Sequence, residues 1–214
     1  MGVAGAMLCY LSKFTQAMKE TRLTLLPDAR ITALSPGFRE GLLSVAESVT
    51  PDNLGSILDE SMRRVLELAF KQAGADEGAV WLVEESTKSL VPAYNNGPNA
   101  SKLVGQFRQP LSAGLVSMVF STQQPFMEND VWENSGLDKT LDTILHQQTN
   151  AMIAIPFYFL EACRGVVSCV QFALPESSPK RGFTERHEAL IRHAAVVLGR
   201  LLDHKVLRTL VGLG

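Results

Sequence analysis

The stretch "AMIAIPFYFLEACRGVVSCVQFAL", residues 151–174, contains two apolar runs separated by four residues that are charged or small. The runs at 151–160 and 165–174 hold several β-branched and aromatic residues, which predicts two strands, and 161–164 predicts the hairpin turn between them. The second run is apolar along most of its length. We therefore expect its strand to lie in the middle of a sheet, covered on both faces.

The segments around this hairpin predict helices packed on a sheet. Apolar positions at helical spacing predict a helix over 54–73 that Gly74 ends, and Thr50 followed by Pro51 is typical of a helix start. A long amphipathic helix is expected from Thr184, its N-cap, onward. The other expected elements are strands at 77–85, 88–96 and 105–110, a helix at 115–121, an extended segment from 125 and a helical patch at 141–145. This order predicts an α+β fold.

The first 50 residues predict a helical N-terminal extension, with helices at 10–21 and 38–49. Breaks at Pro27-Asp28 and Pro36-Gly37 separate them. We therefore expect two parts: an extension over 1–50 and a main domain over 51–210 that ends in the long helix.

The composition is that of a globular protein without a nucleic-acid footprint. Apolar residues make up 46% of the 214 residues, charged residues 20%, and the formal net charge is −2, without a basic cluster. The apolar start lacks a positively charged region before it and is too short to span a membrane. The odd count of three cysteines, without a CxxC pair, fits a reducing compartment. These features favour a cytoplasmic protein that binds neither nucleic acid nor membrane.

The order of elements, together with "PLSAGLVSMVFSTQQPFMENDV" (110–131), "AMIAIPF", "RGVVSCVQFA" and "FTERHEALIRHAAVVLG", resembles the GAF domain family, small-molecule sensor modules related to PAS domains. The segment from Thr122 to Asp130 is similar to the family's strand that ends in aspartate. The resemblance covers about residues 54–206. It implies a central antiparallel sheet of about six strands with helices on both sides: the terminal helices on one face, and on the other a roof of loops and short helices. Small ligands would bind between roof and sheet, and most members of the family catalyse nothing.

The variants of the family that depend on a cysteine do not fit this sequence. Members that reduce free methionine sulfoxide, and members that attach a bilin covalently, use cysteines near the glycine turn or in the middle region. Here no cysteine lies between Cys9 and Cys163, and Leu115, Val116 and Ser117 follow the turn. We interpret Cys163 and Cys169 as core-filling thiols, with Cys163 the more exposed of the two.

Phosphate-binding and cyclic-nucleotide motifs are also incomplete. Gly114 stands without the second glycine and the lysine of a phosphate loop, so we interpret it as a hinge between strand and helix. The cyclic-nucleotide motif of the family would need Asn and Asp where Pro179 and His187 stand.

The four histidines do not have the spacing of a metal site. His187, His193 and His204 share the last helix without an i, i+4 pair, and His146 is alone. The sequence therefore shows no bilin, haem or metal motif, and the cofactor stays unknown.

The expected pocket has aromatic and apolar walls with a few polar anchors, as small-molecule sites do. The aromatic residues in strands are also good core candidates, and Trp132 could be a lid. The residues we predict to border the roof are Trp81, Tyr94, Phe107, Arg108, Asn129, Asp130, Trp132, His146, Met152 and Ala154.

We expect a homodimer that forms through the helices at 54–73 and 184–210, since apolar positions of the last helix recur every three and four residues. Ligand binding would then shift the helix geometry. No kinase, cyclase or helix-turn-helix pattern follows, so a separate signalling protein is the expected partner. The alternative is a ligand-free interaction scaffold whose pocket is filled by its own side chains, and a divergent enzyme comes third. A volume lined by Trp132, Asp130 and His146 would favour the sensor.

Overall fold

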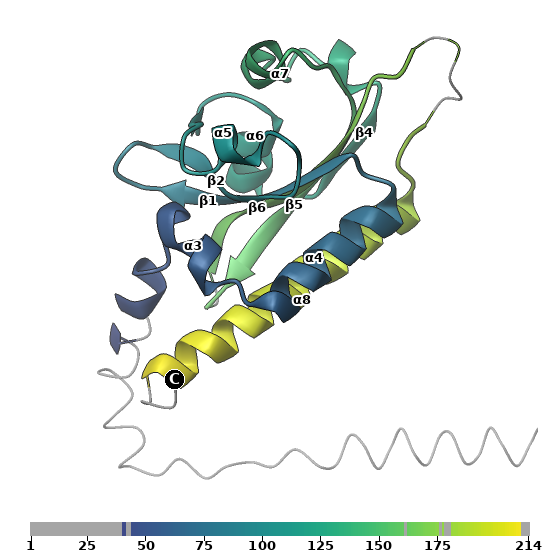
Figure 1. The fold of residues 1–214 in the computed structure, drawn as a ribbon. Coiled ribbons are helices and arrows are strands. Elements are labelled where there is room, and N and C mark those ends of the chain that lie inside the picture. Colours follow the sequence, from purple (N-terminus) through teal and green to yellow (C-terminus); the bar gives the residue numbers. More distant parts are fainter. Residues whose placement is uncertain (1–39, 42–43, 161, 176, 178–180, 211–214) are drawn as a thin grey trace, which may run out of the picture. The chain divides into compact units, whose positions relative to one another are not determined.

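The computed structural model describes residues 40–41, 44–160, 162–175, 177 and 181–210 (Figure 1). The expected helix at 10–21 lies outside these residues. Of the one expected at 38–49, residues 40–41 and 44–47 are helical. The further elements are α3 (Pro51–Ile57), α4 (Glu60–Ala73), β1 (Glu77–Glu84), β2 (Ser89–Asn95), α5 (Ala100–Leu103), β3 (Gln109–Pro110), α6 (Leu115–Thr122), β4 (Phe126–Asn129), the 3-10 helix η1 (Val131–Glu133), α7 (Thr140–Leu145), β5 (Thr149–Phe159), β6 (Ala162–Phe172) and α8 (Glu185–Leu210).

The six strands form one antiparallel sheet in the order β3-β2-β1-β6-β5-β4, which confirms the predicted α+β fold. β5 and β6 pair as the predicted hairpin over most of their length, with Ile153 opposite Cys169. β6 also pairs with β1, so it has a neighbour on each side. Its apolar sequence thus correctly indicated a central strand.

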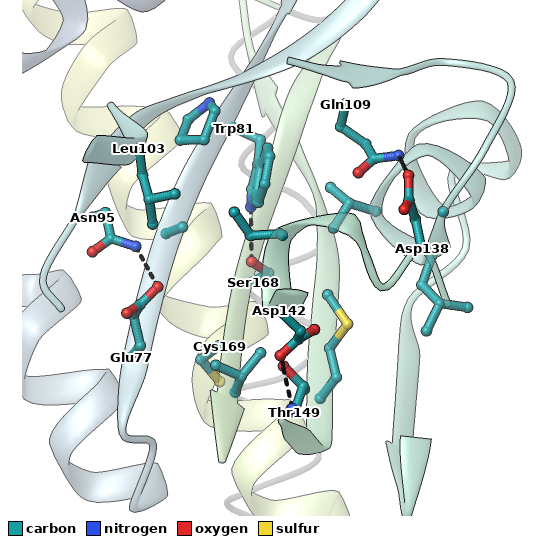
Figure 2. Close-up of a pocket in the computed structure, with 18 of the residues that line it drawn as sticks. Glu77, Trp81, Asn95, Leu103, Gln109, Asp138, Asp142, Thr149, Ser168 and Cys169 are labelled. Atoms are coloured by element: carbon teal, nitrogen blue, oxygen red, sulfur yellow. Dashed lines mark hydrogen bonds between the residues drawn. The ribbon is translucent and has the colours of Figure 1, made fainter. Parts of the chain in front are cut away.

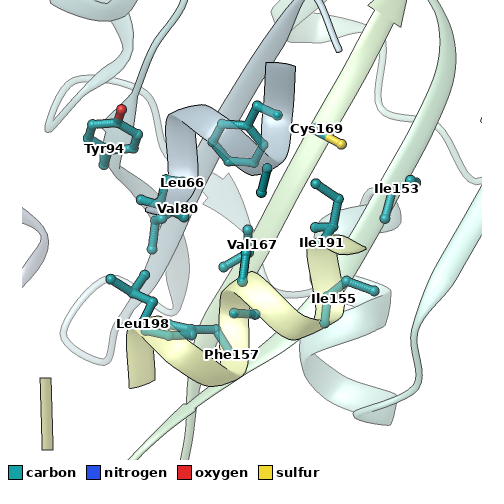
Figure 3. Packing of buried hydrophobic residues seen from close by; sticks show 14 of the residues in the cluster. Leu66, Val80, Tyr94, Ile153, Ile155, Phe157, Val167, Cys169, Ile191 and Leu198 are labelled. Carbon is teal, nitrogen blue, oxygen red and sulfur yellow. The ribbon is translucent and has the colours of Figure 1, made fainter. Parts of the chain in front are cut away.

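Each face of the sheet carries its own hydrophobic core, because strand side chains alternate between the faces. α4 and α8 cover one face, where Phe70, Val80, Phe157, Val167 and Leu198 belong to a single buried cluster (Figures 1 and 3). On the other face, which we call the roof side, α5, α6, α7 and η1 lie above the sheet. A second cluster there includes Trp81, Leu115, Val119, Met152 and Val166. The predicted helices on both sides are therefore confirmed.

The predicted continuous helix over 54–73 is wrong, because the structure has two helices, of which the first ends at Ile57 and the second begins at Glu60. Asp59 caps the second helix: its Oδ1 accepts a hydrogen bond from the backbone N–H of Met62 at 3.0 Å. Thr50 and Pro51 begin α3, and Gly74 ends α4 in the left-handed conformation (φ 68°), both as predicted.

The predicted strand at 105–110 is much shorter in the structure, where only Gln109 and Pro110 pair with β2. The backbone N–H groups of Gln106 and Phe107 both donate to the carbonyl of Leu103, at 3.0 and 3.1 Å. Because these groups close turns after α5, they are not available to a sheet. The segment at 100–103, for which we made no prediction from the sequence, forms α5.

α8 is the longest element and packs on α4 and β5. It begins directly after Thr184, as predicted, and the carbonyl of Thr184 accepts from the N–H of Glu188 at 3.0 Å. Near its other end, Asp203 accepts from the backbone N–H of Leu160 at 2.6 Å. Within the described ranges, neither α8 nor another helix combines the length and apolarity needed to cross a membrane.

Candidate ligand pocket

A cavity of about 80 Å³ lies on the roof side of the sheet, between β1, β5 and β6 below and α6 and α7 with their neighbouring loops above (Figure 2). Its wall is mixed. The larger apolar side chains that line it are Trp81, Leu103, Leu115, Val116, Leu137, Leu141, Met152 and Val170. The polar ones are Glu77, Asn95, Gln109, Asp138, Asp142, Gln147, Thr149 and Ser168.

Trp81 forms the aromatic part of the sheet-side wall and is held in place on two sides. Its indole N–H donates to Ser168 Oγ on β6 at 2.9 Å, and the ring of Phe107 meets it edge-on with centroids 6.2 Å apart. Because the indole N–H already has a partner, Trp81 offers a ligand mainly its apolar ring.

Glu77, the first residue of β1, brings a carboxyl group into this wall although only 6% of the residue is exposed. Asn95 at the end of β2 donates to Glu77 Oε1 at 2.7 Å, and Asn95 Oδ1 accepts from the N–H of Gly97 at 2.7 Å. Burial raises the pKa of Glu77, and the nearby charge of Asp142 raises it further, against the hydrogen bond from Asn95.

Asp142 ties α7 to the sheet. Its Oδ1 accepts hydrogen bonds from both the backbone N–H and the Oγ1 hydroxyl of Thr149, each at 2.8 Å. Burial raises the pKa of Asp142 although these bonds and the charge of Lys139 oppose the shift. The bond pair places α7 over the cavity.

Gln109 and Asp138 close the opposite side. Gln109 Nε2 donates to Asp138 Oδ2 and to the carbonyl of Ala113, each at 2.9 Å. Hydrogen bonds from Thr140 and Gln109 lower the pKa of Asp138. Gly114 has φ 83°, and a Cβ there would lie 2.8 Å from Gln109 Nε2, so its predicted role as a hinge is confirmed.

Of the ten residues predicted to border the roof, Trp81 and Met152 line this cavity. Tyr94 is on the opposite face, in the cluster under α4 and α8, with the guanidinium of Arg63 at 5.9 Å from its ring centre. This placement corrects our expectation. Tyr94 pairs across the strands with Val80, which also packs under the helices, and cross-strand partners share a face.

Phe107, Ala154 and Arg108 lie near the cavity without lining it. Phe107 packs against the edge of Trp81, and Ala154 is fully buried in the roof-side core. Arg108 is exposed and forms an ion pair with Glu84 at 3.0 Å. The first two therefore support the wall, whereas Arg108 is a surface residue.

The remaining four predicted residues, Asn129, Asp130, Trp132 and His146, lie away from the cavity wall, which corrects our expectation for them. Asn129 exchanges two hydrogen bonds with the backbone of Phe183, at 2.7 and 3.1 Å, and so fixes the segment before α8. Asp130 and His146 are exposed turn residues with positive φ (61° and 52°). Trp132 is half-buried under Lys139 Nζ, which lies 4.3 Å from its ring centre.

Sequence reasoning missed the buried carboxyl groups of Glu77 and Asp142. A signal for Glu77 was present: it lies two and four residues before Ala79 and Trp81, and residues at this spacing in a strand share a face. Asp142 gave no such signal, because it sits in a polar helical segment where an exposed side chain is the ordinary expectation.

The thiols and histidines of the described residues are the remaining candidates for a metal site or a reactive group. No group of three or more His, Cys, Asp or Glu side chains there is arranged to hold a metal ion. Burial raises the pKa of Cys169 to about 12 and also raises that of Cys163, so both thiols are protonated at neutral pH. Cys9 lies outside the described residues.

Comparison with solved structures finds the same fold in many proteins. A GAF domain of a phosphoenolpyruvate-protein phosphotransferase from Coxiella burnetii is 16% identical, with a TM-score of 0.57, and the match covers 80% of this chain and 98% of that one. A GAF domain/HD domain protein from Geobacter sulfurreducens is 19% identical, with a TM-score of 0.54 and coverages of 69% and 93%. A free methionine-R-sulfoxide reductase from Neisseria meningitidis is 16% identical, with a TM-score of 0.52 and coverages of 80% and 91%.

Among curated proteins nothing matches. The solved structures are too distant in sequence to establish more than the fold. A family model, described as GAF domain, matches residues 56–203 and thus more than half of the chain. On this match, and in agreement with the resemblance in sequence and the six-stranded sheet, the chain belongs to the GAF domain family.

Proposed function

We propose that this chain is a non-catalytic sensory domain that binds a small molecule in the roof-side cavity. Binding of the ligand would be signalled by a change in the arrangement of α4 and α8. The observation that carries this proposal is the cavity itself. It has an apolar wall interrupted by a few buried polar groups, which is the usual character of a small-molecule site. Of the two thiols of the described residues, Cys169 is buried and Cys163 half-buried, and burial raises the pKa of both, which favours binding over cysteine chemistry.

The proposed route of the signal runs through the thickness of the sheet. On β1, Trp81 faces the cavity while its neighbour Val80 packs under the helices. On β5, Met152 faces the cavity and Ile153 the helices. A ligand that displaces either strand would therefore change the surface on which α4 and α8 pack.

We further propose that α4 and α8 meet their mates in a homodimer. Leu68 on α4 and Val196 on α8 are large apolar side chains with 45% and 48% of their surface exposed. A dimer contact on these helices would bury them. The oligomer mass of the full chain, measured by native mass spectrometry, tests this part on its own.

A ligand-free interaction module is the second candidate, and the size of the cavity favours it. Sites for drug-sized ligands enclose about 300–1,000 Å³, whereas this cavity has about 80 Å³. A cavity of this size restricts the sensor to small ligands.

The test uses two variants of α7. Leu141→Trp places a large ring in the cavity wall, and Ile144→Trp makes a comparable change on the same helix at a side chain that is 59% exposed. The purified chain is analysed by native mass spectrometry for a co-purifying molecule and by thermal shift against a panel of amines, amino acids, carboxylic acids and nucleobases. We expect a compound that stabilises the wild type and Ile144→Trp but not Leu141→Trp. If no compound shows this pattern, the scaffold is the better description.

A further inference from the structure

The part of the sheet beneath the cavity carries a row of small side chains. Ser168 on β6 pairs with Ala79 on β1 and with Ala154 on β5, and cross-strand partners share a face of the sheet. The larger side chains of Trp81 and Met152, each two residues from one of these alanines, lie on the same face. The row therefore leaves space above the sheet between larger neighbours, and Ser168 is its polar member.

Ser168 brings a hydroxyl group with an unused O–H to this buried position. The residue is 4% exposed and lines the cavity, and its Oγ accepts the indole N–H of Trp81 at 2.9 Å (Figure 2). A hydroxyl can donate one hydrogen bond while it accepts another, yet no group of the described residues accepts one from Ser168. The bond from Trp81 holds the oxygen in place and leaves the hydroxyl hydrogen for a partner in the cavity.

The carboxyl groups of the wall are for the most part committed to the protein. Both oxygens of Asp138 accept hydrogen bonds. Glu77 Oε1 also accepts one, and its Oε2 is buried against Gly97, so it does not face the cavity. Asp142 Oδ1 accepts two bonds from Thr149, which leaves Oδ2. A cationic ligand would therefore gain one carboxyl oxygen in exchange for its hydration, which is a poor exchange at a buried site.

The wall is equally unsuited to an anionic ligand. Three carboxyl groups line the cavity, and within the described ranges no lysine or arginine does so. A carboxylate or phosphate group would lose its hydration beside like charges and without a cation to balance it, which costs free energy. A neutral ligand avoids the cost of burying a charge of either sign.

We propose that the cavity binds a small neutral molecule whose oxygen atom accepts a hydrogen bond from the Ser168 hydroxyl and whose apolar body lies against the ring of Trp81. Short ketones and amides belong to this class. The inference rests on the proposed function and adds the chemical class of the ligand. The small size follows from the cavity volume of about 80 Å³, and the apolar body follows from the predominantly apolar surface of the wall.

The test uses five probes that share one branched carbon skeleton and differ at one end. Methyl isopropyl ketone and isobutyramide are neutral and carry a carbonyl oxygen, isobutyrate is an anion, and isobutyramidine is a cation at neutral pH. The fifth probe is the alkene in which a methylene group replaces the ketone oxygen. Binding to the full chain at neutral pH is measured by ligand-observed NMR titration. We expect the ketone and the amide to bind at least tenfold more tightly than the two ions, and to lose this binding in Leu141→Trp but not in Ile144→Trp. Equal or tighter binding of either ion would overturn the inference.

Ser168→Ala removes the hydroxyl group and keeps a small side chain. It should weaken binding of the ketone by about five- to tenfold, the loss expected for one hydrogen bond, and leave binding of the alkene unchanged. A general disturbance of the wall, including the loss of the acceptor for Trp81, would weaken both. Ser117→Ala is the matched control, because Ser117 is also buried but donates to the carbonyl of Pro110 at 2.8 Å and is not part of the cavity wall; it should change neither. If Ser168→Ala binds the ketone as the wild type does, or weakens the alkene equally, Ser168 does not recognise the oxygen and the inference fails.

Failure of this inference differs from failure of the proposed function. If none of the five probes binds with sensitivity to Leu141→Trp, the ligand class is wrong. The proposed function fails as well only if no compound of its own panel shows this sensitivity.

Discussion

Gly199, in the middle of α8, is a position where the proposed signalling helix packs directly against the backbone of the sheet. A Cβ added there would overlap the backbone oxygen of Tyr158 on β5 and lie 3.4 Å from its carbonyl carbon. The overlap is with the oxygen, and because non-bonded heavy atoms rest at about 3.5 Å, Gly199→Ala forces α8 to withdraw by roughly 1 Å. Since the obstacle is backbone, no side chain can rotate away to relieve it.

The magnitude follows from two opposing terms. Overpacking a core costs typically about 1–3 kcal/mol, and we take the upper end because the fully buried Leu198 and Leu202 move with the helix. Replacing glycine by alanine inside a helix returns about 1 kcal/mol. The net loss in free energy of unfolding is therefore about 2 kcal/mol, which for a domain of this size lowers Tm by about 4–8 °C.

Gly55 in α3 provides the matched control. The nearest atom to a Cβ added there is the backbone oxygen of Ala93 at 3.9 Å, an ordinary contact. Gly55→Ala should therefore raise the free energy of unfolding by about 0.5–1 kcal/mol through helix propensity alone. Thermal unfolding followed by circular dichroism, with urea unfolding as a check, compares the variants with the wild type. If Gly199→Ala is as stable as the wild type or more stable, α8 does not pack as closely on β5 as described.

Three further predictions use the same unfolding assays. Phe157→Ala should cost about 3–5 kcal/mol because the ring is fully buried, whereas Ile144→Ala should change stability by less than about 0.5 kcal/mol; similar values for both would contradict the two-core packing. The pKa of Glu77 in the folded state is raised above 4.5. Its favourable contribution to the free energy of unfolding is therefore present below pH 4.5 and is lost as the pH rises through the folded pKa. The stability of Glu77→Gln relative to the wild type should therefore increase with rising pH, by about 1 kcal/mol in free energy of unfolding at neutral pH. An increase that does not depend on pH would count against a raised pKa of Glu77. Burial alone would raise the pKa of Asp76, yet hydrogen bonds from Arg181 and the backbone lower it below 3.8. Asp76→Asn should thus reduce the free energy of unfolding by at most about 1 kcal/mol at neutral pH, and not at all once the pH falls below the folded pKa. An unchanged loss of stability in acid would refute the lowered pKa.

The fold was predictable because its signals are local and repeated. The apolar hairpin at 151–174 identified the centre of the sheet. Gly74 correctly predicted the end of α4, and Thr184 correctly predicted the start of α8. The break between α3 and α4 was hidden, because the apolar periodicity continues across it. In the structure, the extended backbone of Leu58 and Asp59 and the hydrogen bond from the N–H of Met62 to Asp59 separate the two helices, but an aspartate among alternating polar and apolar residues gives no unique signal in the sequence.

The site was harder to predict because a pocket depends on which face each residue takes. Tyr94 and Trp81 are both strand aromatics, yet they lie on opposite faces of the sheet. Because the pairing with β2 shifts register between Val80 and Trp81, residue spacing alone does not predict which face a side chain of β2 takes. We predicted Asp130 and His146 as site residues because polar residues in loops often carry function. In the structure both occupy turns with positive φ, so their backbone conformation accounts for these residues.

The hydrogen bond between Trp81 and Ser168 bears directly on the proposed transmission of a signal from the cavity to the helices. It joins β1 to β6 on the roof side. One residue away along these strands, Val80 and Val167 are paired and point into the core under α4 and α8. Because the two strands are linked on one face and packed on the other, a ligand that moves Trp81 would move both valines together. The helix surface would then receive a concerted displacement of two strands, which a tightly packed core transmits more readily than the motion of a single side chain.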